Sequence, residues 1–421
     1  MMFTQRYRSH HSARRQFKEG FVLSGNPEQY VRSILEKPRD CRKTIYIHVP
    51  FCRKICNFCA MFRSLRQDQE TYFNQLKAQI EALSPWAYMQ DPIDSIYFGG
   101  GTPTALTSEM MASILDLLHK HFNLVDGVEV SVETTATELD EEMLKSLKAG
   151  GVNRLSVGIQ TFNDPGRELM NRYGTGDFAR SRLHLALDAG IKNTNMDLIY
   201  TYPGQSLDDL AQDLKTMQET DIAGFSFYGL NLLDASVFAN SLSQDQIDQV
   251  NDPGRERAMF DLIYESMGAA GFKLLELNKM VKPGRDSYEY IHIRNQGGDT
   301  IALGDGAGGS FASYSYYNRY PLRSLAPDLA VSAMGQIYDP SYRLIREFDF
   351  AWQQAEVDMD LYGAKLELDL WVILEDLLEK YDKAGLIKKE GQVIKLTQSG
   401  IFWGYNMINE IIETLVERAY N

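Results

Sequence analysis

The chain has 421 residues, of which 44% are hydrophobic, 11% aromatic and 24% charged. This length and composition are typical of a folded protein with one large domain and one smaller one. The formal net charge of −14 at pH 7 argues against a general nucleic-acid binder, because phosphate contacts need clustered lysines and arginines. The sequence contains no run of 18 apolar residues, so it predicts no membrane span.

Basic residues gather near the N-terminus in RYRSHHSARR, residues 6–15. We interpret residues 1–43 as an N-terminal extension and this stretch as a mobile arm, because no apolar segment follows it as in a secretory signal. Four cysteines in the whole chain are too few for a disulfide framework, so we expect a reducing, cytoplasmic location. Cys41 stands apart from the other three and is interpreted as a spare thiol.

A strand pattern followed by a helix pattern repeats between residues 44 and 240. The predicted strands are residues 44–49, 95–100, 128–133, 154–160, 194–200 and 224–230. The predicted helices are residues 69–84, 108–122, 140–151, 178–190 and 206–220. This alternation predicts an α/β fold with parallel strands and right-handed crossovers, either an open doubly wound sheet or a barrel-like (βα) array.

The repeat does not continue into residues 241–320, which we interpret as a segment that extends the barrel. Its pattern predicts a helix over residues 250–275 and a strand over residues 272–280. Residues 300–318 are rich in glycine and aromatic residues and predict a turn.

Residues 321–421 predict a C-terminal accessory domain. Helix patterns surround KKEGQVIKLTQSG, which predicts a β-hairpin. Helices around a small hairpin are typical of a winged-helix-like domain. We expect no DNA binding from it, because the chain is acidic.

Chemically distinctive residues occur where the predicted strands end. A cysteine cluster in HVPFCRKICNFC follows the first strand, and GGGTPT, residues 99–104, follows the second. The other four strand ends carry Glu133, Gln160, Asp197 and the segment from Tyr228 to Asn231. In both candidate architectures ligands bind at the carboxyl ends of the strands, so these residues predict one shared site.

The clustered cysteines are Cys52, Cys56 and Cys59, with the spacing C-x3-C-x2-C. A zinc site would need a fourth ligand, for which His48 is a candidate, and a redox motif would need only two cysteines. Three thiolates on one loop suit three irons of a [4Fe–4S] cluster. The fourth iron is then open to chelation by a substrate or cofactor.

The segments YIHVPFC, CNFC, YFGGGTPT and GVNRLSVGIQTF resemble the radical S-adenosylmethionine (SAM) superfamily, in its oxygen-independent coproporphyrinogen dehydrogenase-like branch. The resemblance covers residues 44–240 and, more weakly, the rest of the chain. It implies a partial (βα)6 TIM-like barrel with a C-terminal helical, winged-helix-like domain. It also implies that the three cysteines hold a [4Fe–4S] cluster, which cleaves SAM to a 5′-deoxyadenosyl radical.

The resemblance further assigns residues to SAM, of which this branch binds two molecules. Tyr46 and Phe58 are implied to flank the cluster. The implied contacts of the first SAM are Gly100, Gly101, Thr102, Glu133 and Asn231. Those of the second SAM are Gln160, Arg172 and Asp197. Without the resemblance, Arg172 would be an exposed helix charge.

Details within the branch favour one activity. Met61 stands where coproporphyrinogen dehydrogenases tend to carry a further cysteine, and the loop GDGAGG, residues 304–309, lacks the histidine of heme chaperones. QTFNDPGRELMNRYG and the terminal LTQSGIFWGYNMINEII resemble anaerobic heme-utilization enzymes, which methylate heme, open its ring and release iron. The ending CNFCAMF and Tyr202 depart from that pattern and leave the substrate open.

We therefore expect a radical SAM methyltransferase that acts on a tetrapyrrole, heme or another porphyrin, with flavodoxin or another reductase as electron donor. The alternatives are a class C radical SAM methyltransferase for another aromatic substrate, a heme chaperone, and an oxygen-independent coproporphyrinogen III dehydrogenase. The glycines of GDGAGG permit close approach to a substrate. Candidate wall residues are His48, His292, Tyr314, Tyr316 and Tyr317.

Overall fold

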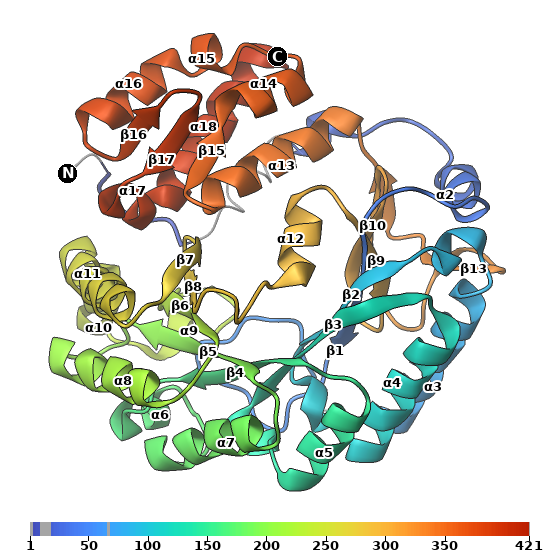
Figure 1. Ribbon diagram of the computed structural model, residues 1–421, viewed down its shortest axis with the longest axis horizontal. Coiled ribbons are helices and arrows are strands. Elements are labelled where there is room, and N and C mark those ends of the chain that lie inside the picture. Colours follow the sequence, from blue (N-terminus) through green and yellow to red (C-terminus); the bar gives the residue numbers. More distant parts are fainter. Residues whose placement is uncertain (1–2, 9–17, 65–67, 421) are drawn as a thin grey trace.

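The computed structural model describes residues 3–8, 18–64 and 68–420 (Figure 1). All six strands of the predicted repeat are present and lie side by side, in chain order, in one parallel array. They are β1 (Lys43–Val49), β2 (Ile93–Gly100), β3 (Leu124–Thr135), β4 (Arg154–Gln160), β5 (Asn193–Tyr200) and β6 (Gly224–Gly229). The predicted α/β fold with parallel strands is therefore confirmed.

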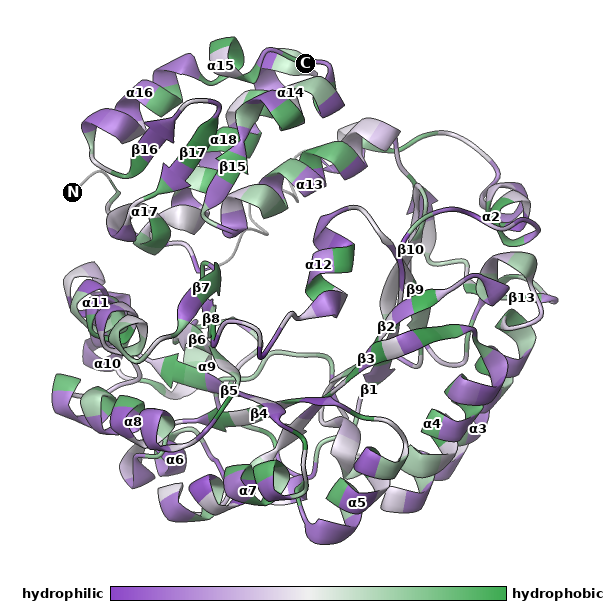
Figure 2. Ribbon diagram, in the orientation of Figure 1, coloured by the Kyte–Doolittle hydropathy of each residue, from purple (hydrophilic) through white to green (hydrophobic). Residues whose placement is uncertain are grey.

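The predicted helices lie along the outer face of this array (Figure 1). They are α3 (Gln69–Leu83), α4 (Ser108–His121), α5 (Glu141–Ala149), α7 (Gly176–Asp188) and α8 (Leu207–Glu219). Each begins after a residue whose side chain accepts a first-turn backbone N–H, namely Asp68, Thr107, Asp140, Thr175 and Ser206. Figure 2 shows hydrophobic and hydrophilic residues interleaved along them, as expected of helices with one face against a sheet.

A seventh parallel strand, β9 (Asp299–Leu303), pairs with the other side of β1. Three antiparallel strands continue the sheet beyond it, β10 (Gly308–Phe311), β11 (Tyr314–Tyr317) and β14 (Gly335–Ile337). The prediction of a turn over residues 300–318 was wrong. The apolar run of β9 is short and is followed by glycines, so its local pattern does not predict a strand. It is stabilised as a strand by pairing with β1, about 255 positions earlier in the chain.

The opposite edge of the sheet is a hairpin of β7 (Lys273–Glu276) and β8 (Lys279–Val281), in which β8 pairs antiparallel with β6. The prediction of one strand over residues 272–280 was wrong, because a turn at Leu277 and Asn278 divides it. The hairpin follows α11 (Pro253–Ala269), which lies within the helix predicted over residues 250–275. The strand order of the sheet does not return on itself, so the barrel is partial, as expected.

The helix α12 (Glu289–Asn295) lies inside the curve of the sheet (Figure 1). It contacts β1, β2 and β9. The ring of Tyr290 stacks on Tyr97 with centroids 4.3 Å apart and on Tyr46 with centroids 5.8 Å apart. Part of the barrel interior is therefore filled by aromatic side chains.

The C-terminal region is helical around a small sheet, as predicted. Its helices are α13 (Pro340–Gln353), α14 (Met359–Leu366), α15 (Leu370–Ile373), α16 (Glu375–Lys383), α17 (Gln398–Phe402) and α18 (Gly404–Ala419). Its strands are β15 (Glu356–Asp358), β16 (Ile387–Glu390) and β17 (Val393–Leu396), of which the last two form the predicted hairpin. The remaining α-helices and strands are α2 (Pro27–Leu35), α6 (Asp164–Leu169), α9 (Phe238–Ser241), α10 (Gln244–Asn251), β12 (Ser324–Ala326) and β13 (Leu329–Ser332).

The N-terminal residues contact the folded body. Arg6 and Arg8 both form ion pairs with Glu256 of α11, so the prediction of a mobile arm was wrong for this part of RYRSHHSARR. Its other residues, 9–15, lie outside the described residues. No helix in the described ranges is long and apolar enough to cross a membrane.

A buried ion network joins the centre of the sheet to the loop before α12. Arg154 donates two hydrogen bonds to the carboxylate of Asp286, at 2.9 and 3.2 Å, and the ammonium of Lys279 lies 3.2 Å from the same group. The three side chains are at most 2% exposed. Burial alone would raise the pKa of Asp286, but the two cations lower it well below its usual range.

We expect Asp286→Ala to lower the free energy of unfolding by about 3–5 kcal/mol, because it leaves two cations buried without their anion. Asp221 provides a matched control, since it pairs with Lys282 and Arg285 of a neighbouring segment but is 64% exposed. Asp221→Ala should cost less than about 1 kcal/mol. Urea denaturation measures the free energy of unfolding of both variants. Equal losses would show that the buried network stabilises the fold no more than the exposed ion pair does.

Candidate functional site

A cavity of about 520 Å³ lies at the carboxyl ends of the parallel strands. It brings together residues from the cysteine loop, from the ends of β2 to β6 and from the N-terminal segment. The predicted site residues that line it are Cys52, Cys56, Phe58, Cys59, Gly100, Gly101, Thr102, Glu133, Gln160, Arg172, Asp197 and Asn231. Residues far apart in the sequence therefore share one space, as the positions of the strand ends predicted.

Tyr46 is the one predicted site residue that does not line this cavity. Its ring packs beside Tyr97 and Tyr290 inside the barrel. Its hydroxyl lies 3.0 Å from Nδ1 of His48, two residues along β1 and on the same face of the strand. Tyr46 therefore supports the floor of the site from within the barrel.

The candidate wall residues also lie away from the cavity. None of His48, His292, Tyr314, Tyr316 and Tyr317 lines it, so their role as wall residues of a substrate site stays a prediction. The three tyrosines lie on β11, four strands from β2 in the sheet. The GDGAGG loop packs behind the cysteine loop, where a Cβ at Gly306 would lie 2.5 Å from the ring of Phe62.

Backbone hydrogen bonds attach the cysteine loop to its surroundings. The amide of Cys52 donates to the carbonyl of Ser64 at 3.2 Å, and the amide of Thr102 donates to the carbonyl of Phe51 at 2.7 Å. From the other side, the amide nitrogen Nδ2 of Asn171 donates to the carbonyl of Ile55 at 2.8 Å. The loop is thus held between GGGTPT and the segment that follows α6.

Two glycines of GGGTPT are required by this packing. A Cβ at Gly101 would lie 2.5 Å from the carbonyl oxygen of Phe51. Gly100 has φ +114°, and a Cβ there would lie 2.8 Å from the ring of His48. The close approach of the cysteine loop to β2 therefore explains both glycines before any ligand is considered.

The ring of His48 is already engaged by the protein. Nδ1 faces the hydroxyl of Tyr46, and Nε2 lies 3.2 Å from the carbonyl oxygen of Phe62, which it can only approach as a donor. The described part of the chain contains no group of three His, Cys, Asp or Glu side chains placed to hold one metal ion. These contacts argue against zinc with His48 as the fourth ligand.

The thiols fit a larger group better than a single ion. In a [4Fe–4S] cluster each thiolate binds a different iron, so the sulfurs lie further apart than around one ion. Burial raises the pKa of Cys52 and of Cys59. Arg172 donates from Nη1 to the sulfur of Cys56 at 3.0 Å.

Two half-buried carboxyl groups form the inner end of the site. Burial raises the pKa of Glu133 to about 7, although Tyr97 donates to its Oε1 at 2.6 Å and the amide of Gly100 to its Oε2 at 3.3 Å. Burial also raises the pKa of Asp197 to about 6, while Lys279, Arg154 and Arg172 lower it. Such carboxyls can accept hydrogen bonds from an ammonium group or from ribose hydroxyls.

Gln160 and Arg172 present unpaired polar atoms in the same cavity. Oε1 of Gln160 and Nε of Arg172 are buried and have no hydrogen-bond partner among the described residues. The backbone of Gln160 has φ +76°, a left-handed conformation that is uncommon for a residue with a side chain. Because a buried unpaired polar atom costs about 1–3 kcal/mol, these atoms indicate a place for a polar ligand.

The sequence interpretation missed two cationic residues of the cavity, Arg6 and Arg8. No local pattern points to them, because they lie in a basic stretch without strand or helix periodicity. Lys54, Arg63 and Tyr405 also line the cavity. Lys54 and Arg63 are close to the three cysteines in the sequence, and this closeness could have predicted that they line the same cavity.

Comparison with known proteins identifies the domain. The model of the radical SAM superfamily matches residues 46–217. Anaerobilin synthase from Escherichia coli O157:H7 is 27% identical over 386 residues, which span 89% of this chain and 85% of that protein. The heme chaperone HemW from Bacillus subtilis (strain 168) is 28% identical over 394 residues, which span 89% of this chain and 100% of that protein.

A solved structure shows the same fold. Coproporphyrinogen III oxidase (HemN) from Escherichia coli matches with a TM-score of 0.79 at 20% identity, over 98% of this chain and 97% of that chain. The chain therefore contains a radical SAM domain, as predicted. Beyond that domain, the chain is similar to anaerobilin synthase and to HemW over 89% of its length. The radical SAM superfamily implies a [4Fe–4S] cluster and SAM as cofactors.

The raised pKa of Glu133 predicts a pH effect on stability. The folded state keeps this carboxyl protonated up to about pH 7, whereas its ordinary pKa is 4.5. The folded state therefore binds more protons between these values, and its stability falls as pH rises through this range. Glu133→Gln cannot titrate, so we expect the variant to gain stability relative to the wild type from pH 5 to pH 8, on the order of a few kcal/mol.

Urea denaturation of the cofactor-free protein at several pH values measures this difference. Glu109→Gln is the control, because this exposed carboxyl has a pKa lowered by hydrogen bonds from its own backbone amide and from Thr107. It should show no gain over the same range. A pH-independent difference between wild type and Glu133→Gln would contradict the prediction.

Proposed function

We propose that this radical SAM enzyme methylates heme and opens its ring, so that iron is released. The proposal rests on two supports. One is the set of unpaired polar groups beside Asp197, which can bind the polar groups of a second SAM in the same cavity. The other is the similarity over most of both chains to anaerobilin synthase.

In this proposal Cys52, Cys56 and Cys59 hold the [4Fe–4S] cluster through three of its irons. When bound, the cluster supplies the electron that cleaves SAM to a 5′-deoxyadenosyl radical. The protein positions the thiolates by the loop contacts to GGGTPT and to Asn171. Arg172 donates a 3.0 Å hydrogen bond to the sulfur of Cys56 and so orients this side chain. Phe58 covers one side of this group within the cavity.

Residues at the ends of β2, β3 and β6 hold the first SAM. Gly100 and Gly101 leave backbone carbonyls uncovered, and Thr102 adds a hydroxyl. Glu133 accepts hydrogen bonds from the ammonium group or a ribose hydroxyl, and Tyr97 and the Gly100 amide fix its orientation. Asn231 offers backbone atoms at the end of β6.

Gln160, Arg172 and Asp197 hold the second SAM. The single observation that carries this assignment is that Oε1 of Gln160 and Nε of Arg172 are buried, unpaired and part of the same cavity as the Asp197 carboxyl. A guanidinium pairs with a carboxylate, a carboxylate with ribose hydroxyls, and an amide with either. One amino-acid ligand with a ribose would satisfy all three. Two SAM molecules are what methyl transfer on this scaffold requires.

A heme chaperone is the second candidate function. It is favoured by the match to HemW over the whole length of that protein. Two observations argue against a chaperone. The GDGAGG loop has no histidine, and a heme carrier does not need the unpaired polar groups of Gln160 and Arg172. Coproporphyrinogen III dehydrogenation and methylation of another aromatic substrate are further alternatives. Flavodoxin or another reductase is the proposed electron donor.

The test is an anaerobic incubation of cluster-reconstituted protein with heme, SAM and a chemical reductant. Mass spectrometry should detect 5′-deoxyadenosine, S-adenosylhomocysteine and a methylated linear tetrapyrrole, with release of iron. Heme binding with none of these products would instead indicate a chaperone. Formation of 5′-deoxyadenosine and carbon dioxide from coproporphyrinogen would indicate the dehydrogenase.

Cys56→Ala should reduce bound iron from about four per chain to less than one and abolish the visible absorption of the cluster, because one of three thiolates is lost. Cys41→Ala is the matched control. The sulfur of Cys41 lies 3.4 Å from Asp299 at the start of β9 and does not line the cavity. Iron analysis and absorption spectra measure both variants, and retention of a full cluster in Cys56→Ala would refute this ligand set.

Asp197→Asn should lower the number of SAM molecules bound per chain from two to one. The amide keeps the size of the side chain but removes the carboxylate that accepts from ribose hydroxyls. Equilibrium dialysis with labelled SAM, on protein with a complete cluster, measures the stoichiometry. Binding of one SAM by the wild type, or of two by the variant, would contradict the assignment.

A further inference from the structure

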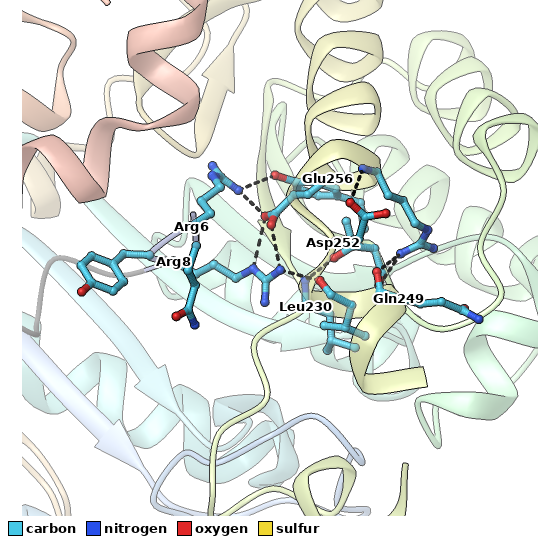
Figure 3. Close-up of polar contacts among 12 residues, drawn as sticks. Arg6, Arg8, Leu230, Gln249, Asp252 and Glu256 are labelled. Carbon is cyan, nitrogen blue, oxygen red and sulfur yellow. Dashed lines mark hydrogen bonds and ion pairs between the residues drawn. The ribbon is translucent and has the colours of Figure 1, made fainter. Parts of the chain in front are cut away.

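The N-terminal segment, residues 3–8, spans from the C-terminal region to the edge of the barrel. Asn406 of α18 donates to the carbonyl of Gln5 and accepts from the amide of Tyr7, both at 2.9 Å. Nε of Arg6 donates to the carbonyl of Phe402 at 2.7 Å. The segment is thus positioned by backbone and side-chain contacts, and its two arginines point from it toward α11 (Figure 3).

Both arginines meet one buried carboxylate. Glu256 is 1% exposed and pairs with Nη1 of Arg6 and, at 2.7 Å, with Nη2 of Arg8 (Figure 3). Burial alone would raise the pKa of Glu256, but the two guanidiniums lower it. The carboxylate is therefore ionised, and the three side chains together carry one excess positive charge.

This excess charge borders the candidate site. Arg6 and Arg8 both line the cavity that contains the cysteines, and their side chains are 7% and 11% exposed. Nη2 of Arg6 and Nη1 of Arg8 donate to no residue of the described ranges. A desolvated cation with a spare donor is stabilised by an anion, and the planar guanidinium matches a carboxylate best.

The end of β6 leaves space for the ion pair of Arg8 and Glu256. Gly229 ends this strand, and a Cβ there would lie 2.3 Å from Oε1 of Glu256 and 3.1 Å from Nε of Arg8. The absence of a side chain therefore lets Glu256 and Arg8 pack against the end of β6, where Gly229 and Arg8 line the cavity. Of the other cations of the wall, Lys54 and Arg63 lie on the cysteine loop, on the side proposed for the cluster, and Arg172 donates to the sulfur of Cys56.

We propose that Arg6 and Arg8 bind a carboxylate group of the substrate at the wall of the cavity formed by the N-terminal segment. The inference rests on the proposed function, because it takes the substrate to be a tetrapyrrole with carboxylate side chains at its rim. Glu256 holds the two guanidiniums in place and neutralises one charge. The other charge selects an acidic tetrapyrrole over an uncharged one.

The test compares mesoporphyrin, which carries carboxylates, with its dimethyl ester, by absorbance titration of the full chain. The wild type should bind the acid at least about tenfold more tightly than the ester, as expected for a hydrogen bond to a charged group. Arg8→Ala should remove most of this preference, and Arg8→Lys should restore part of it. The matched control is Arg257→Ala, on the same helix as Glu256 but paired with Asp261 outside the cavity.

A second variant, Glu256→Gln, separates a role of the two arginines in substrate binding from a role in attaching the N-terminal segment. Glu256→Gln keeps the hydrogen-bond acceptor but leaves both guanidinium charges unbalanced, so it should bind the acid more tightly than the wild type does. If the triad only attaches the N-terminal segment, Glu256→Gln and Arg8→Ala would weaken binding of acid and ester alike, and the inference fails. If the wild type binds neither porphyrin, the proposed function fails with it. If it binds both equally, only the inference is overturned.

Discussion

The site depends on the parallel register of β1 to β6, which brings six strand ends to one edge of the sheet. Val49 pairs with Gly100, Glu133 with Ser156, and Gly158 with Asp197. The backbone of each strand is satisfied by its neighbours. The segments that follow the strands are therefore free to carry glycines, thiols and charges. Residues separated by up to about 180 positions share one cavity because the strands that carry them end together.

The same arrangement places acidic groups over a cationic core. Glu133 and Asp197 are half-buried, and their desolvation raises the pKa of each. Beneath them, Arg154 and Lys279 are held by Asp286, and both cations lower the pKa of Asp197. The ion network that stabilises the barrel interior thus also adjusts the charge of the site. A substitution of Arg154 or Lys279 would therefore change the pKa of Asp197 without replacing a residue that lines the cavity.

The sequence predicted the parts of this protein whose signals are local. The six strands and their helices follow from periodicity and capping residues, and the strand-end positions of Glu133, Gln160 and Asp197 followed from them. β9 was missed because its five residues are stabilised by pairing with β1 across about 255 positions. Alternation along β1 directs Tyr46 into the barrel, where its ring stacks on Tyr290 of α12. α12 has no counterpart in the strand–helix repeat, so nothing predicted that contact.

The N-terminal segment shows why net charge is a poor guide to a site. The chain carries −14 overall, yet its cavity takes arginines from the N-terminus, the cysteine loop and the segment after α6. Arg6 lies 250 positions from Glu256, so neither residue signals the other in the sequence. Arg6 contacts Phe402 of the C-terminal region, pairs with Glu256 of α11 and lines the cavity. Attachment of the accessory region and the electrostatics of the site are therefore set by the same buried group.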